Sequence, residues 1–306
     1  MNADTNNQYV FVVGLPRTGT KLVRNILQNS KTTTCIISPE TWFFGDLFRS
    51  GIQKKIRSIG NLNIDANIHI LADYLFSGSF RRTYWILLAD DEINITKEKF
   101  VELLLKSDRS DKAIYCTIMK AYAFSYREDI EGAILGDKTP GHLYYIEQLR
   151  LWFPDAKIIH TFRDPRAIAA SEWKRMVGER PKTLANLLTN WIYSIAVVLY
   201  VSITWLYAVR LHAKYSRLYP NNYLLSKYED LVTNPEKNTQ ILCDFIGIET
   251  SEEMQTPKKV NSSFVEQKGA GFDKEAINRW QSYLKPWIKL WLKTICNKYL
   301  KQFDYK

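Results

Sequence analysis

Residues 9–21 of the chain read YVFVVGLPRTGTK, an apolar run followed by a loop between two glycines. The run predicts a buried β-strand, and the loop predicts a turn into a helix. The first turn of a helix has free backbone N–H groups and the positive end of the helix dipole, so it favours an anion. Gly14 and Gly19 allow the backbone to approach a ligand closely, and Arg17 adds charge-assisted donors. This stretch therefore predicts an α/β fold with a phosphate-binding loop after its first strand.

The loop is similar to a Walker A motif, but two residues are in reverse order. A Walker A motif has Lys and then Ser or Thr after its second glycine, where they reach the β- and γ-phosphates and magnesium. Here Thr20 comes first and Lys21 second. The reversal argues against a site for ATP and magnesium. Taken alone, the loop is equally consistent with an ordinary strand-to-helix turn.

A second strand, loop and helix pattern supports the phosphate-binding interpretation. The apolar run at 158–162 leads into RDPR at 163–166, in which the aspartate can cap a helix and the proline fits its first turn. Arg163, Ser171 and Arg175 could then converge on one phosphate group, because the last two follow at helical spacing. Two such units predict a ligand that carries phosphate at both ends.

The composition is that of a globular protein with a basic surface. Apolar residues make up 46% of the 306 residues and charged residues 24%, and the net charge is +10. This charge either aids solubility or favours a polyanionic ligand or acceptor. The lysines are spread along the chain, so no nucleic-acid partner is predicted. The four cysteines form no CxxC pair and have no histidine at metal-ligand spacing, which predicts reduced, structural thiols and no metal site.

Apolar runs alternate with helical patterns along the chain, which predicts a parallel sheet with helical crossovers. The predicted strands lie near 9–13, 33–37, 133–136, 157–162 and 223–227. The predicted helices lie near 18–29, 141–153, 165–177, 184–217, 235–246 and 274–303. No linker divides the chain. We expect one α/β domain over residues 1–306, a P-loop NTPase-like parallel sheet flanked by helices, with a helical insertion at about 41–130.

Two charged residues follow predicted strands at the edge where a doubly wound sheet binds its ligand. Glu40 comes after the apolar run at 35–37 and before three aromatic residues. It could be partly desolvated and act as a general base, or be a first-turn glutamate favoured by a helix dipole. Lys138 follows the strand predicted at 133–136 and could neutralise a leaving group, or be a solvated lysine. His142 is a second candidate base, or a polar residue in a helix's first turn.

Taken together, these motifs resemble those of the sulfotransferase family that uses 3′-phosphoadenosine-5′-phosphosulfate (PAPS). The first loop is similar to the family's 5′-phosphosulfate loop, and residues 157–171 are similar to its 3′-phosphate motif. Further likenesses are Tyr228-Glu229-Asp230-Leu231 before Asn234-Pro235-Glu236, Asn261-Ser262-Ser263-Phe264, and a glycine-rich loop at 268–271 that leads to Arg279-Trp280. The order matches from about residue 9 to the C-terminus, with 50–130 unmatched. The likeness is greatest to the tyrosylprotein and bacterial branch.

The resemblance implies the sulfotransferase fold and a PAPS-dependent enzyme that moves a sulfonate group to a hydroxyl acceptor by metal-free in-line displacement. Glu40 corresponds to the general base, and Arg17 and Lys138 to the residues that stabilise charge on the leaving group. Ser262 or Ser263 corresponds to a further catalytic residue. The implied cofactor-binding residues are Arg17, Thr18, Gly19, Thr20, Lys21, Arg163, Ser171, Arg175, Tyr228, Lys268 and Arg279.

Two residues of the first loop depart from the family's pattern. Thr18 stands where serine is common, which is a mild change. Lys21 stands where threonine is usual. The second change removes one hydroxyl contact and adds a positive charge beside the sulfonate, while the backbone donors remain.

Other functions and several acceptors stay open. A P-loop kinase-like phosphotransferase would use ATP and Mg²⁺ with Asp137 as a metal ligand, and a catalytically silent nucleotide-binding or membrane-docking protein would bind without turnover. Mg²⁺ dependence and product analysis distinguish these functions. A protein tyrosine, a glycan hydroxyl, a lipid and a small molecule all fit as acceptor. We expect 41–130 and the helix at 184–217 to shape its pocket.

The location of the protein depends on the stretch 183–209, which has no charged residue and is long enough to span a bilayer. A span would put Arg163 and Tyr228 on opposite sides of the membrane, although both are expected at one cofactor. We therefore expect a helix packed in the fold, with homodimer formation or peripheral membrane contact through 184–211 left open. The N-terminus is polar and lacks an apolar signal core, which predicts a cytoplasmic protein or a catalytic fragment anchored by a segment outside this chain.

Overall fold

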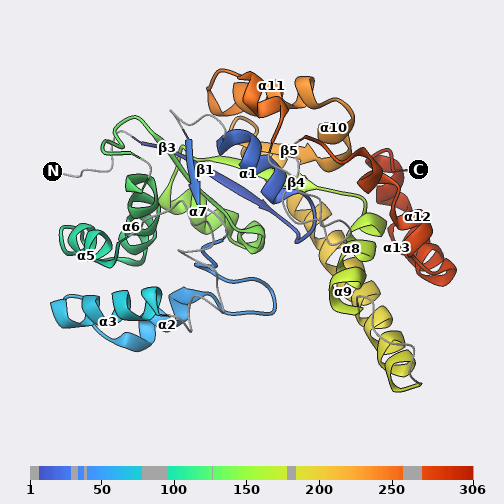
Figure 1. The fold of residues 1–306 in the computed structure, drawn as a ribbon, viewed down its shortest axis with the longest axis horizontal. Coiled ribbons are helices and arrows are strands. Elements are labelled where there is room, and N and C mark those ends of the chain that lie inside the picture. The colour runs from blue at the N-terminus through green and yellow to red at the C-terminus, as the bar shows by residue number, and fades with distance from the viewer. Residues whose placement is uncertain are drawn as a thin grey trace.

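The computed structural model describes residues 7–28, 34–37, 40–77, 96–125, 127–177, 184–257 and 271–305. Within these residues, five parallel strands form one sheet in the order β2-β3-β1-β4-β5 (Figure 1). They are β1 (Gln8–Gly14), β2 (Thr34–Ile37), β3 (Ile134–Lys138), β4 (Lys157–Phe162) and β5 (Tyr223–Lys227). The five predicted strands are thus confirmed. The winding reverses at β1, and a doubly wound sheet binds its ligands at such a point, beyond the carboxyl ends of the strands.

Helices connect the strands, as predicted. The α-helices are α1 (Thr20–Gln28), α2 (Ile52–Ile59), α3 (Asp65–Phe76), α5 (Lys97–Leu105), α6 (Asp111–Phe124), α7 (Ile146–Trp152), α8 (Pro165–Val177), α9 (Leu184–Leu218), α10 (Tyr228–Thr233), α11 (Pro235–Ile246), α12 (Trp280–Tyr283) and α13 (Pro286–Gln302). The 3₁₀ helices are η1 (Pro140–Tyr145), η2 (Glu252–Gln255) and η3 (Lys274–Ile277).

Two predicted helices differ in form from the observed ones. The helix predicted near 141–153 begins as η1 and continues as α7. The helix predicted near 274–303 is divided into η3, α12 and α13. Lys285 is extended, as expected of a residue directly before a proline, so the chain cannot continue as one helix into Pro286.

Alternate residues of β1 face two different hydrophobic clusters. Phe11 and Val13 belong to the larger cluster, together with residues of α6, α7, α8, α9 and α13. Val10 and Val12 belong to the smaller cluster, together with residues of α1 and α11. Because β1 is buried on both faces, its sequence is a continuous apolar run without alternation. The packing on both faces holds the loop that follows β1 in a fixed place at the edge of the sheet.

The part of the chain between β2 and β3 is mainly helical where it is described. α2, α3, α5 and α6 belong to it and form one side of the molecule in Figure 1. α6 packs against β2 and β3, and its Tyr115 and Met119 are fully buried. The helical character agrees with the prediction. Its description as an insertion in a single domain stays a prediction.

One face of α9 is packed in the fold and another is exposed. By length and apolar composition alone, residues 189–218 could cross a membrane, but half of the most apolar stretch is buried inside the protein. The indole N–H of Trp205 donates to the carbonyl oxygen of Arg163 at 2.9 Å, which ties α9 to the loop after β4. Ile192 and Ile203 lie on the exposed side. The expected packing of this helix within the fold is therefore observed for one of its faces.

Candidate active site

A cavity of about 710 Å³ lies beyond the carboxyl ends of β1, β3 and β4. Eleven of the predicted site residues line it, namely Arg17, Gly19, Thr20, Lys21, Glu40, Lys138, Arg163, Ser171, Arg175, Tyr228 and Arg279. Ser262, Ser263 and Lys268 lie outside the described residues. The two predicted phosphate-binding loops and the two candidate catalytic residues therefore line one cavity.

The first loop has a strained conformation that directs Arg17 towards the second loop. Arg17 has a φ of 70°, in the left-handed region that non-glycine residues rarely adopt. Its Nε donates to Oγ of Ser171 at 2.8 Å. Gly19 has a φ of 96° and lies against the ring of Tyr228, where an added Cβ atom would come within 2.7 Å of a ring carbon. Strain of this kind is concentrated at functional sites, where the surrounding structure holds it.

Thr18 supports the loop from inside the protein. Its side chain is buried, and its hydroxyl donates to the carbonyl oxygen of Leu15 at 2.6 Å. The same hydroxyl lies 2.7 Å from that of Thr161 at the end of β4. Thr18 is absent from the residues that line the cavity, whereas Thr20 is among them. The hydroxyl that faces a ligand is therefore that of Thr20, and Thr18 shapes the loop.

The second loop begins α8 as predicted and buries Arg163. The carboxylate of Asp164 accepts a bond from the backbone N–H two residues later at 2.8 Å, so it caps the helix. Arg163 donates to the carbonyl oxygens of Arg17 at 3.0 Å and Ala276 at 2.7 Å. Its guanidinium lies 4.1 Å from the ring centre of Tyr228. Its Nε is buried and has no hydrogen-bond partner among the described residues, so one donor remains for a ligand.

Glu172 is a buried carboxylate beside these cations that the sequence analysis missed. Its side chain is 4% exposed and accepts bonds from Nε and Nη2 of Arg175 at 2.9 and 2.7 Å. Burial lowers the pKa of Arg17 below its ordinary value, and the charges of Arg175 and Arg163 lower it further, while Glu172 opposes them. The spacing of Glu172 and Arg175 on α8 is a signal in the sequence, but the same spacing is common in exposed ion pairs. Arg17 therefore lies within electrostatic reach of one carboxylate and of two further arginines, which leaves net positive charge for a phosphate.

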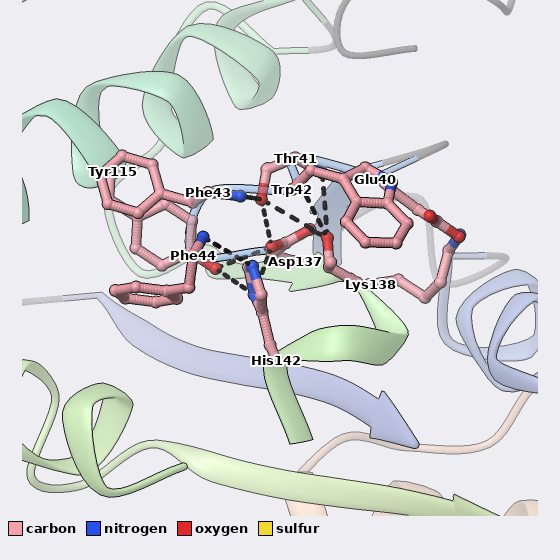
Figure 2. A network of polar contacts seen from close by, with 10 residues as sticks. Glu40, Thr41, Trp42, Phe43, Phe44, Tyr115, Asp137, Lys138 and His142 are labelled. Atoms are coloured by element: carbon pink, nitrogen blue, oxygen red, sulfur yellow. Dashed lines mark hydrogen bonds and ion pairs between the residues drawn. The ribbon is translucent and has the colours of Figure 1, made fainter. Parts of the chain in front are cut away.

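An ion pair joins the two candidate catalytic residues (Figure 2). Nζ of Lys138 donates to Oε1 of Glu40 at 2.8 Å. The side chain of Lys138 is 3% exposed and that of Glu40 is 24% exposed, and both line the cavity. Lys138 is therefore no solvated surface lysine. Glu40 is no first-turn glutamate, because it lies in a non-helical segment and α2 begins only at Ile52.

A buried network next to this pair fixes the segment that carries Glu40 (Figure 2). Asp137 accepts a bond from the hydroxyl of Thr41 at 2.6 Å and another from Tyr115 at 2.7 Å. Nδ1 of His142 lies 3.1 Å from the same carboxylate. Burial alone would raise the pKa of Asp137, but the bonds from His142, Thr41 and Tyr115 lower it below its ordinary value. Thr41 directly follows Glu40, so this network determines where the glutamate stands.

The same network argues against two of the sequence-based alternatives. Nε2 of His142 accepts a bond from the backbone N–H of Phe44 at 3.4 Å, and the residue does not line the cavity. His142 is therefore not placed as a base. Asp137 also lies outside the cavity lining and is occupied by protein donors, so it is not placed to hold Mg²⁺ beside the first loop. This disfavours the kinase-like alternative.

The outer part of the cavity is lined by the segment after β2 and by α9, the two regions expected to shape an acceptor pocket. The segment contributes Trp42, Asp46, Phe48 and Arg49, and α9 contributes Ala196, Val197 and Tyr200. The rings of Phe48 and Tyr200 lie 5.6 Å apart, so the two walls meet. Burial raises the pKa of Tyr200 to about 12, which keeps its hydroxyl neutral. The sequence contains no motif that singles out these residues.

The charges of the cavity fit a ligand with several negative charges. Of the described residues, seven basic side chains and four acidic ones line it. The N-terminus of α1, the unpartnered Nε of Arg163 and the hydroxyls of Thr20 and Ser171 add donors for phosphate oxygens. Among the described residues, no group of three His, Cys, Asp or Glu side chains could hold a metal ion. Metal-free chemistry stays a prediction.

Comparisons with known proteins agree with the observed fold and identify the family. The model of the family described as "Sulfotransferase family" matches residues 9–252. The sulfotransferase domain of the olefin synthase from Synechococcus PCC 7002 has a TM-score of 0.59 and 20% identity, over 98% of this chain and 97% of that chain. The sulfotransferase domain from the curacin biosynthetic pathway has a TM-score of 0.54 and 16% identity, over 98% of both chains. At these identities the two structures show that the fold is shared.

No curated protein matches the sequence significantly. The family match covers most of the chain and includes both phosphate-binding loops and the two candidate catalytic residues. The chain belongs to the sulfotransferase family.

Proposed function

We propose that the protein transfers a sulfonate group from PAPS to a hydroxyl group of an acceptor, by in-line displacement and without a metal ion. The observation that carries the proposal is the ion pair between Glu40 and Lys138, which faces the same cavity as both phosphate-binding loops. A carboxylate and an ammonium group that lie side by side can act on the two ends of one transfer. The carboxylate suits the attacking hydroxyl, and the cation suits the leaving group.

The two loops would hold PAPS by its phosphates. The start of α1, together with Arg17 and Thr20, fits the 5′-phosphosulfate end. Arg163, Ser171 and Arg175 fit the 3′-phosphate end, since all three line the cavity. When bound, PAPS supplies the sulfonate group and a phosphate leaving group.

The residues of the chain would divide the chemistry between them. Glu40 accepts the proton of the acceptor hydroxyl as the hydroxyl oxygen attacks. Lys138 and Arg17 stabilise the negative charge that develops on the leaving group. Phosphoryl transfer normally uses Mg²⁺ for this task, but a sulfonate group carries less charge, so the two cations can suffice.

The activity is tested by incubating the chain with PAPS and a panel of protein-tyrosine, glycan, lipid and small-molecule acceptors. Mass spectrometry reads the gain of one sulfonate group, and each reaction is run with Mg²⁺ and with excess chelator. We expect the same gain in both conditions, and tight binding of the desulfated product PAP in calorimetry. A loss in chelator that Mg²⁺ restores, or a phosphate gain from ATP, would favour a phosphotransferase. Binding of PAP without transfer to any acceptor would favour a silent nucleotide-binding protein.

A further inference from the structure

A second apolar feature lies on α9 and α13, away from the phosphate-binding loops. A groove of about 350 Å³ is lined by Trp191, Ile195, Val198, Leu199, Trp287 and Trp291. Trp291 spans the two helices, because its indole N–H donates to the hydroxyl of Ser202 at 3.2 Å. The two helices also contact each other. The groove is therefore a feature of two joined helices and not of one loose segment.

The groove continues into an exposed face, which we call the apolar face. It consists of Trp191, Ile192, Leu199 and Ile203 of α9 with Trp287, Leu290, Trp291 and Ile295 of α13. These side chains are between 37% and 67% exposed. On α13 they occupy one side of the helix, while Ile288, Leu292 and Cys296 occupy the buried side. A contiguous exposed surface of large apolar side chains on a soluble fold marks an interaction site.

The charged residues of α9 and α13 are all basic. Neither α9 nor α13 contains an aspartate or a glutamate. On the same side of α13, Lys298 falls about one turn and Lys301 nearly two turns beyond Ile295, and Lys293 borders that side. An apolar stripe with tryptophans and flanking lysines is typical of helices that lie in the interface of an anionic membrane.

We propose that the apolar face docks the protein on the surface of an anionic lipid bilayer, with the tryptophans at the headgroup level and the lysines against the lipid phosphates. A second copy of the chain fits less well. It would bring the same basic rim against itself, and neither helix supplies a carboxylate to neutralise that rim. A span across the bilayer is also disfavoured, because Trp205 and the rest of one side of α9 are buried in the fold.

The docked surface would lie next to the active site. On α9, Ile192, Leu199 and Ile203 form the exposed stripe, and Ala196 and Tyr200 lie beside it and line the large cavity. At 100° per residue these two sets are neighbouring strips of one helix. A bilayer on the apolar face therefore sits beside the outer part of that cavity.

Vesicle co-sedimentation tests the proposal with the whole chain. The wild-type protein should sediment with vesicles of phosphatidylcholine and phosphatidylglycerol, and much less with phosphatidylcholine alone. Leu290→Glu together with Ile295→Glu should lower the partition coefficient by at least about tenfold, because both substitutions put charge into the interface. Lys293→Glu together with Lys298→Glu should remove the preference for anionic vesicles.

The matched control is Leu151→Glu together with Ile70→Glu. The side chains of Leu151 and Ile70 are 73% and 51% exposed and lie on other helices. It should bind vesicles like the wild type, and all variants should keep the wild-type affinity for PAP, which shows that they are folded. Equal binding by the control and the Leu290/Ile295 variant would overturn the proposal, as would absence of wild-type binding to anionic vesicles. A lipid-free dimer that the Leu290/Ile295 variant abolishes would assign the face to a second copy instead. Binding that resists both high salt and alkaline carbonate would indicate insertion of α9.

Discussion

Nε of Arg17 donates to Oγ of Ser171 at 2.8 Å and thereby joins the loop after β1 to α8, the two segments predicted to bind phosphate. Arg17 has a left-handed backbone, a conformation that costs on the order of 1–3 kcal/mol. The bond to Ser171 and the bond from Arg163 to the carbonyl oxygen of Arg17 help to hold it. The shape of the first loop therefore depends on the second, and a ligand with two phosphate groups meets a site whose halves are already connected.

This bond predicts coupling between the two loops. Arg17→Lys keeps the charge but loses the Nε donor, and Ser171→Ala removes the acceptor. We expect their effects on PAP affinity to be non-additive, with a coupling energy of about 1 kcal/mol. Calorimetry of the two single variants and the double variant measures it. Additive losses would show that the bond contributes nothing to cofactor binding.

Glu40→Gln should leave PAP affinity unchanged within a few-fold and lower turnover by roughly 10²–10⁴-fold, the usual contribution of a positioned base. Asp46→Asn is the matched control, since Asp46 is another carboxylate that lines the cavity. Its turnover should fall less than about tenfold. Near-normal turnover of Glu40→Gln, with loss of activity in Asp46→Asn, would move the base to the second carboxylate.

Arg163→Ala should weaken binding of PAP much more than binding of AMP, which lacks the 3′-phosphate. The loss of a buried charge-assisted partner costs on the order of 2–5 kcal/mol of binding free energy. Only PAP has the 3′-phosphate that would lose its guanidinium partner. Arg163 also bonds to two carbonyl oxygens, so a smaller loss common to both ligands is expected.

Arg166→Ala is the control for this comparison. Arg166 is buried in the first turn of α8 and paired with Asp164, but it is not among the residues that line the cavity. Its replacement should affect PAP and AMP equally. If Arg163→Ala also affected the two ligands equally in calorimetry, the 3′-phosphate would have to be bound elsewhere.

His160 should make the protein less stable as the pH falls. Burial lowers its pKa from 6.5 to about 3, with a further contribution from His212. Between these two values the unfolded chain binds a proton that the folded protein does not. The contribution of the neutral His160 to the free energy of unfolding is therefore fully present above pH 6.5 and decreases as the pH falls towards 3. The slope for one group is about 1.4 kcal/mol per pH unit.

Urea unfolding at pH 7.5, 6 and 5 measures this effect. The wild-type free energy of unfolding should decrease between pH 6.5 and 5, and His160→Gln should make that decrease smaller by about 2 kcal/mol. The control is His69→Gln, at an exposed histidine on α3. Its free energy of unfolding should depend on pH as that of the wild type does. An unchanged slope in His160→Gln would mean that the buried imidazole is protonated in the folded protein.

Local sequence was sufficient to predict the five strands, the cap of α8 and the strand-to-helix turns after β1 and β4. Each of these features is specified within a few consecutive residues. The apolar run of β1, the glycines after it and the aspartate before α8 act on their own neighbours in the chain. The composition of α9 likewise showed that the helix is apolar beyond the needs of one buried stripe. The break before Pro286 was a local signal that the prediction did not use.

The contacts that define the site arise between segments far apart in the chain. Glu40 meets Lys138 because β2 and β3 are neighbours in the sheet, and Arg17 meets Ser171 because β1 lies beside β4. Local patterns contain no information about which strands become neighbours. Neither the Glu40–Lys138 ion pair nor the Arg17–Ser171 hydrogen bond could therefore be predicted from these patterns alone. The same holds for Glu172 and for the two faces of α9. Their environments exist only after helices and sheet have packed, because burial is a property of the assembled fold and not of a segment.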